Sequence, residues 1–315
     1  MITDRPRLDL IRRPLILAGA ALFAASASNP AARRATVLAD ADRAAKAVIE
    51  KEAQLDVSKI PARTFAVLPF AAASADTILE PLRFGLATLL TNDLSASPSL
   101  QMVERLHTDA ILRELNMVDE GLVDPKGAPR VGRLVGARRV LIGDAARVGN
   151  TVRLSARVVD VIGGTVQNLL TAEAPLDRVI DAEKQLALQL FERLGITLTP
   201  AQRARVERRQ TTQTAALIAF GKGVEAEAKG DAKRAVASYQ EAVRLDAAFS
   251  TSRAQVSSPT LTSAAAPITN LSRVIDFSSQ AINTPVITNT RTTDVANPPN
   301  VGGGLTLTFI IRVTP

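Results

Sequence analysis

Three β-rich segments, separated by short glycine-containing breaks, put the strongest constraint on the fold. The breaks are Gly149-Asn150 and Gly163-Gly164, and the segments are RRVLIGDAARV (138–148), TVRLSARVVDV (151–161) and TVQNLLTAEAP (165–175). Two-residue breaks of this kind between β-rich runs are hairpin signals. We therefore expect the three segments to form an antiparallel meander.

The middle segment also predicts how the meander is buried. Apolar and polar residues alternate along it: Val152, Leu154, Ala156 and Val158 against Arg153, Ser155 and Arg157. Successive side chains of a strand point to opposite faces of the sheet. One face of the meander is therefore expected to pack on the protein and the other to meet water.

The region before the meander predicts helices that alternate with short strands. The apolar run 65–68 ends at Pro69, which suits a buried strand leaving its sheet. Leucines at helical spacing predict a helix over 79–95. A second strand is expected at 100–103, and further helices at 105–115, within 125–137, and at 176–195. The order β-α-β-α-α-β-β-β-α predicts an α/β domain over 61–196, a mixed sheet with an antiparallel meander covered by helices.

Eight short pieces of this domain carry a family resemblance. They are FAVLPF (65–70), GLA (85–87), MVER (102–105), ILREL (111–115), GLVD (121–124), GA (136–137), LIG (141–143) and RVVDV (157–161). In their order and spacing they resemble the bacterial curli-assembly (CsgG/HfaB-like) proteins and the related amino-terminal domain of TolB.

The resemblance implies a non-catalytic periplasmic module that works in envelope assembly or secretion by binding other envelope proteins. Whether it forms a homo-oligomer is left open. Family members that form channels insert two long amphipathic hairpins and carry a lipid-anchor cysteine. Here the breaks are two residues long and the chain has no cysteine. Because spanning strands need about 9–11 alternating residues each, we expect a relative without a channel.

The first 60 residues indicate export followed by a helix. Residues 1–27 read as a signal peptide, with four arginines, an apolar core and the small-x-small site Ala25-Ser26-Ala27. The apolar stretch 14–27 is shorter than the roughly 20 residues of a membrane span, so cleavage is expected and an uncleaved anchor is the alternative. The location implied is the periplasm or outer envelope, with no transmembrane segment after cleavage. Residues 28–60 are expected to be an exposed helix whose narrow apolar stripe docks on the next domain or on a partner.

Residues 197–249 predict a charged helical linker and then a helical hairpin. The hairpin, 216–249, resembles one tetratricopeptide repeat. A lone repeat cannot bury its apolar face, so it packs on the α/β domain or waits for a partner. A plain helical hairpin without a binding role is the alternative. The candidate protein-binding residues are Gly223, Ala235, Tyr239 and Ala242.

The C-terminal part changes composition. Residues 250–304 are rich in Ser, Thr, Asn and Pro and are expected to be disordered. The end of the chain, 305–315, contains LTLTFIIRV, which alternates as a strand does. Its residues Leu307, Phe309 and Ile311 are candidates for protein binding, by pairing with an edge of the chain's own sheet or of another molecule. A frayed terminus is the alternative.

Composition limits the chemistry. The chain has no cysteine and one histidine, which excludes disulfides, thiolate sites and multi-histidine zinc sites, so no cofactor is expected. The net charge is +7 with 3% aromatic residues, which does not indicate nucleic-acid binding.

No residue is named as catalytic. We expect His107 to lie on the surface and Glu104-Arg105 to form an ion pair at a strand end. The function predicted is that of an envelope scaffold. The alternative is a ligand-binding or hydrolytic envelope enzyme that uses carboxylates such as Asp76 and Glu80.

Overall fold

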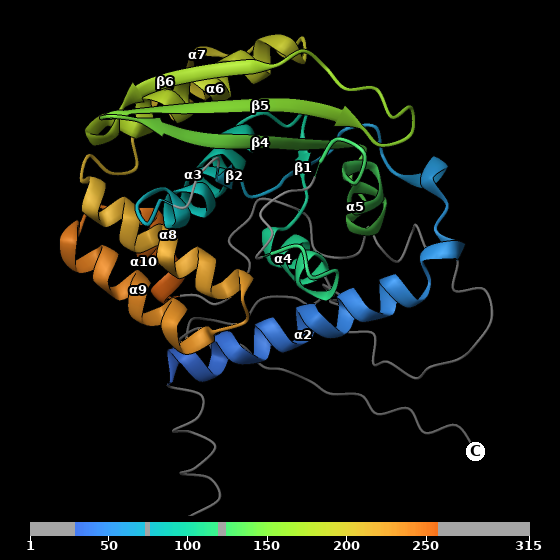
Figure 1. Ribbon diagram of the computed structural model, residues 1–315, viewed down its shortest axis with the longest axis horizontal. Coiled ribbons are helices and arrows are strands. Elements are labelled where there is room, and N and C mark those ends of the chain that lie inside the picture. The colour runs from blue at the N-terminus through green and yellow to red at the C-terminus, as the bar shows by residue number, and fades with distance from the viewer. Residues whose placement is uncertain (1–28, 73–75, 119–123, 258–315) are drawn as a thin grey trace, which may run out of the picture. The chain divides into compact units, whose positions relative to one another are not determined.

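The computed structural model describes residues 29–72, 76–118 and 124–257 (Figure 1). The expected signal peptide lies outside the described residues. So do most of the expected disordered segment and the whole C-terminal strand, with Leu307, Phe309 and Ile311.

The described residues contain one six-stranded mixed sheet. Its order is β3-β1-β4-β5-β6, with β2 also paired to β4. The strand β1 runs parallel to β3 and β4, whereas β4, β5 and β6 are antiparallel. The strands are β1 (Thr64–Val67), β2 (Ala71–Ala72), β3 (Gln101–Met102), β4 (Arg139–Val148), β5 (Thr151–Asp160) and β6 (Leu170–Pro175). The predicted mixed sheet with an antiparallel meander is confirmed.

Helices cover this sheet, as predicted. The helices α3 (Leu79–Leu94) and α6 (Val179–Arg193) contact each other and the strands, and α6 lies along β6. The helix α5 (Ala128–Val135) packs on β4 and β5, where Gly132 lets Val140 and Val161 approach. The helix α4 (Arg105–Glu114) contacts α5 and β1.

The two connections of the meander differ from each other. Gly149-Asn150 is the tight turn expected, with Gly149 at φ +60°. The second connection is longer than expected, because β6 begins at Leu170 and not at 165. Val159 lies opposite Val166, a pairing that would bring Ala156 opposite Leu169. Instead Ala156 lies opposite Leu170. One extra residue is therefore inserted before β6, as in a β-bulge.

The helix α2 (Pro30–Glu50) is shorter than the helix expected over 28–60, and its apolar stripe docks on the chain itself, which is one of the two expectations for that stripe. It packs against α4 and α9 (Ala232–Leu245) (Figure 1). Its Leu38 meets Leu106 and Ala232, and Ala41, Ala45 and Val48 are also buried. The apolar stripe thus docks on the chain itself, since leaving it in water would forgo the hydrophobic stabilisation of burial.

The helical hairpin, α8 (Thr214–Ala228) and α9, follows the short helix α7 (Pro200–Glu207) and packs on the α/β domain. The helices α3 and α8 cross where Gly85 meets Gly221, and a Cβ on Gly221 would lie 2.1 Å from the Pro81 carbonyl oxygen. Of the two expectations for this hairpin, packing on the domain is the one observed.

Helix α10 (Ser250–Ser257) lies where disorder was expected to begin. The preceding Phe249 is fully buried against Phe220, with ring centroids 5.1 Å apart, and the Ser252 hydroxyl donates to the Tyr239 carbonyl at 3.0 Å. These contacts with the hairpin order eight residues of a polar segment. Its remainder is outside the described residues.

Candidate protein-binding site

The meander presents part of one face to water, as its alternation predicts, whereas α5 covers the end of that face where Val140 and Val159 are buried. Arg153, Arg157, Thr171 and Glu173 are exposed, whereas their neighbours along β5 and β6 are buried. Ser155 is the exception. It belongs to the polar set but is only 6% exposed, because it lies at the bottom of a hollow in this face.

The hollow has a volume of about 140 Å³. Ile142 lies opposite Arg157, and Asp144 lies opposite Ser155, so these four side chains share one face of β4 and β5. The walls come from two other parts of the chain. One wall is Leu68, Pro69 and Ala71, where the chain leaves β1, and the other is Asp124 and Pro125, just before α5.

The β-bulge supplies an apolar rim. Leu169, which the bulge displaces from the pairing pattern, lines the hollow and is 44% exposed. The same connection exposes Ile162 and Val166. Bulges next to functional sites redirect a side chain in this way. Three exposed apolar residues in one connection are a feature typical of protein-binding surfaces.

The polar groups of the hollow are available to a ligand. Among the described residues, Asp144, Arg157 and the Ser155 hydroxyl have no hydrogen-bond or ion-pair partner. Two other arginines of these strands are paired, Arg147 with Asp76 at 2.6 Å and Arg153 with Glu173 at 2.5 Å. Asp124 uses one oxygen to accept a hydrogen bond from the Gly127 amide at 2.6 Å.

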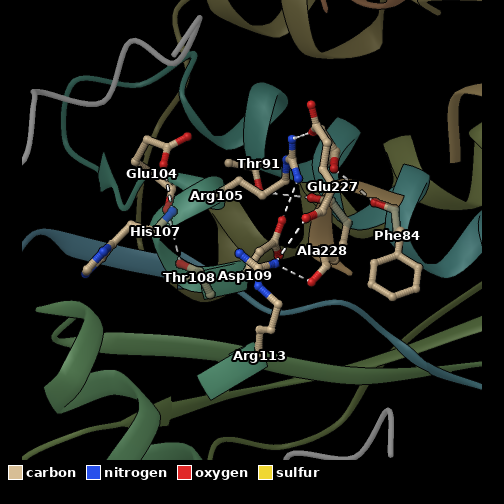
Figure 2. A network of polar contacts seen from close by, with 12 residues as sticks. Phe84, Thr91, Glu104, Arg105, His107, Thr108, Asp109, Arg113, Glu227 and Ala228 are labelled. Atoms are coloured by element: carbon tan, nitrogen blue, oxygen red, sulfur yellow. Dashed lines mark hydrogen bonds and ion pairs between the residues drawn. The ribbon is translucent and has the colours of Figure 1, made fainter. Parts of the chain in front are cut away.

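The other buried ionisable groups hold helices together. Arg105 lies between Asp109, at 2.5 Å, and Glu227 of α8 (Figure 2). Glu104 instead caps α4 by accepting a hydrogen bond from the His107 amide at 2.8 Å. The expected Glu104–Arg105 ion pair is therefore wrong, because Glu104 turns to the helix end and Arg105 turns to α8.

Glu227 joins further helices to this network. It contacts Arg34 of α2 at 2.6 Å and accepts a hydrogen bond from the Tyr239 hydroxyl at 2.7 Å. Arg34 also donates to the main-chain carbonyl of Gln255 in α10. Burial, followed by the charge of Glu227, raises the pKa of Tyr239 well above its usual value. The network therefore ties α2, α4, α8, α9 and α10 together.

The four candidate protein-binding residues of the hairpin lie inside the protein and not on its surface. Ala235, Tyr239 and Ala242 are fully buried, and Gly223 lies against the Tyr239 ring, which a Cβ would approach to 2.5 Å. The structure thus brings these residues together as helix packing. Their role in partner binding stays a prediction.

His107 is not on the surface as expected. It is only 4% exposed, and neither ring nitrogen makes a hydrogen bond of normal geometry. Burial lowers its pKa to about 4. The residues next to His107 in the sequence do not predict its burial, because the burial comes from the packing of α4 in the domain.

Both carboxylates that the enzyme alternative would use form ion pairs with arginines. Asp76 pairs with Arg147 at 2.6 Å, and this hydrogen bond is the largest cause that lowers its pKa. Glu80 pairs with Arg83 at 2.7 Å. In the part of the chain that the structure describes, no group of three or more His, Asp or Glu side chains could hold a metal ion. None of its helices is long and apolar enough to cross a membrane.

The geometry so far defines an α/β domain with a hollowed, partly apolar sheet face. Part of this domain is similar to a known protein family. The model of the family described as "Curli production assembly/transport component CsgG" matches residues 62–168. The matched segment, from β1 to the bulge, is similar to this family and contains every lining residue of the hollow named above except Leu169. The resemblances to TolB and to tetratricopeptide repeats stay predictions.

No curated protein matches the chain. Among solved structures, the C-terminal domain of LpoB from Salmonella enterica is 18% identical, with a TM-score of 0.29. The match covers 38% of this chain and 92% of that one.

Proposed function

We propose that this protein is a non-catalytic protein of the bacterial periplasm or outer envelope that binds other envelope proteins in assembly or secretion. The match of residues 62–168 to a family of assembly and transport components supports this role. The proposed contact surface is the open face of β4, β5 and β6, with the hollow and the apolar connection 161–169.

The observation that carries the proposal is the hollow together with its apolar rim. Leu169 is exposed there, and Asp144 and Arg157 have no ion-pair partner among the described residues, although burying the former and pairing the latter would stabilise the fold. The strongly buried ionisable groups are instead used for helix packing. Nothing comparable supports the enzyme alternative, since Asp76 and Glu80 are both held by arginines.

Site-directed photo-cross-linking tests this role. A photoreactive residue is placed at Leu169, and a matched one at Leu245, which is 37% exposed on α9. We expect Leu169 alone to yield a discrete adduct in envelope preparations. The adduct should disappear when Ile162 and Val166 are both changed to Ser, and the captured protein, once purified, should bind the native chain but not that variant. The same adducts from both positions, or binding that ignores the double change, would contradict the proposal.

The other candidate contacts are proposed on the sequence pattern alone. We propose that residues 305–315, through Leu307, Phe309 and Ile311, add a strand to a partner. Deleting them tests this. Unchanged partner binding, oligomeric state and thermal stability would make the segment a functionless terminus.

A further inference from the structure

We propose that the hollow accepts a cationic side chain, a lysine or arginine, from the polypeptide bound at the open sheet face. This inference rests on the proposed function and specifies the chemistry of its partner. The hollow's volume of about 140 Å³ is suited to one side chain and not to a whole peptide segment.

The walls suit the stem of such a side chain. Leu68, Pro69, Ile142 and Leu169 present apolar surface around the hollow. Lysine and arginine bury their methylene stems on apolar surface while the charged head reaches polar groups. A purely apolar anchor would also fit these walls, but it would bury the Asp144 carboxylate without a partner, which is costly.

The polar groups select a cation. Two carboxylates, Asp144 and Asp124, line the hollow against one guanidinium, that of Arg157. Asp144 is half-buried and unpaired, whereas Arg157 is exposed and can turn to water. The buried Ser155 hydroxyl, also without a partner among the described residues, adds an acceptor for an N–H donor. A bound anion would instead lie beside both carboxylates.

Nuclear magnetic resonance titration with short peptides tests the inference on the full chain. The probes are acetyl-Ala-X-Ala-amide with X as lysine, arginine, norleucine or glutamate. We expect the lysine and arginine peptides to shift amide signals of β4 and β5 around the hollow. The norleucine peptide should bind at least about tenfold more weakly, the size expected for one charge-assisted hydrogen bond.

Two variants and a control decide the assignment. Asp144→Asn should weaken lysine-peptide binding about tenfold, and Arg157→Gln should strengthen it. Glu192→Gln, an exposed acid on α6, should change nothing, and thermal unfolding checks that all three remain folded. Equal binding of norleucine, preferred binding of glutamate, no binding of any probe, or insensitivity to Asp144→Asn would overturn the inference. None of these results bears on whether the cross-linking partner exists, so the two proposals fail separately.

Discussion

At the scale of single residues, burial separates the ionisable side chains that hold the fold from those that meet solvent. His107 is the clearest case, because it is the only histidine in the chain and it is enclosed by α4 and its neighbours. A charged imidazolium there would lose its hydration without gaining a partner. We expect its ring signals in a proton magnetic resonance titration to report a pKa of about 4. A midpoint near the ordinary value of about 6.5 would show that the ring is accessible.

The same residue should make folding stability depend on pH. Its folded-state pKa lies below the unfolded value, so the unfolded chain binds the extra proton between about pH 6.5 and 4. The stability it contributes is present above that window and is lost as pH falls through it, by about 3 kcal/mol in total. Asp109, whose pKa burial raises to about 6, acts in the opposite sense between about pH 3.8 and 6. We therefore expect the free energy of unfolding in urea of the native chain to fall, relative to that of His107→Leu, as pH is lowered from about 6.5 to 4. A difference that stays constant with pH would contradict the prediction.

At the scale of elements, the crossing of α3 and α8 depends on glycine. A methyl group on Gly221 would meet the Pro81 main chain at 2.1 Å, and main-chain atoms cannot turn aside as a flexible side chain can. We expect Gly221→Ala to lower the free energy of unfolding by about 1–3 kcal/mol. Gly163→Ala is the control, since its new Cβ would meet only side-chain atoms at 3.4 Å. Equal denaturation midpoints for the two variants would mean that the helices can separate at no cost.

The elements also show what sequence can and cannot predict here. Period-2 and helical patterns are local properties, and they predicted β4, β5, α3 and α6 within a few residues. The bulge could not be foreseen, because register depends on how Ala156 and Leu170 meet across strands. The hollow depends on that bulge and on walls from distant loops. The Arg105–Glu227 contact joins residues 122 positions apart, which no spacing rule reaches.

At the scale of the whole molecule, Glu227 is the charge that joins α8 to α2, α4 and α9, and Arg34 extends its network to α10. Its side chain is fully buried beside Arg34 and Arg105. Replacing it with glutamine would leave two buried guanidinium groups without their shared carboxylate. We expect Glu227→Gln to cost about 3–5 kcal/mol of folding stability, measured by urea denaturation at pH 7. The control is Glu173→Gln, which breaks the exposed pair with Arg153 and should cost less than about 1 kcal/mol. Similar losses for both variants would show that the buried network adds nothing specific.

The contact between Arg34 and Gln255 has a consequence for how the protein is made. The two residues are 221 positions apart, so the first described helix cannot complete its contacts until the last described helix, α10, has been synthesised. Contacts of such long separation form late, because the entropy of closing the loop must be offset first. Until then α4 alone can cover the apolar stripe of α2, and the part of the stripe that contacts α9 has no surface to cover it. For most of its synthesis, a nascent chain of this protein therefore carries α2 with an incompletely covered apolar stripe. In a crowded cell such a chain would need a chaperone, or it would exchange α2 with a neighbouring copy by domain swapping.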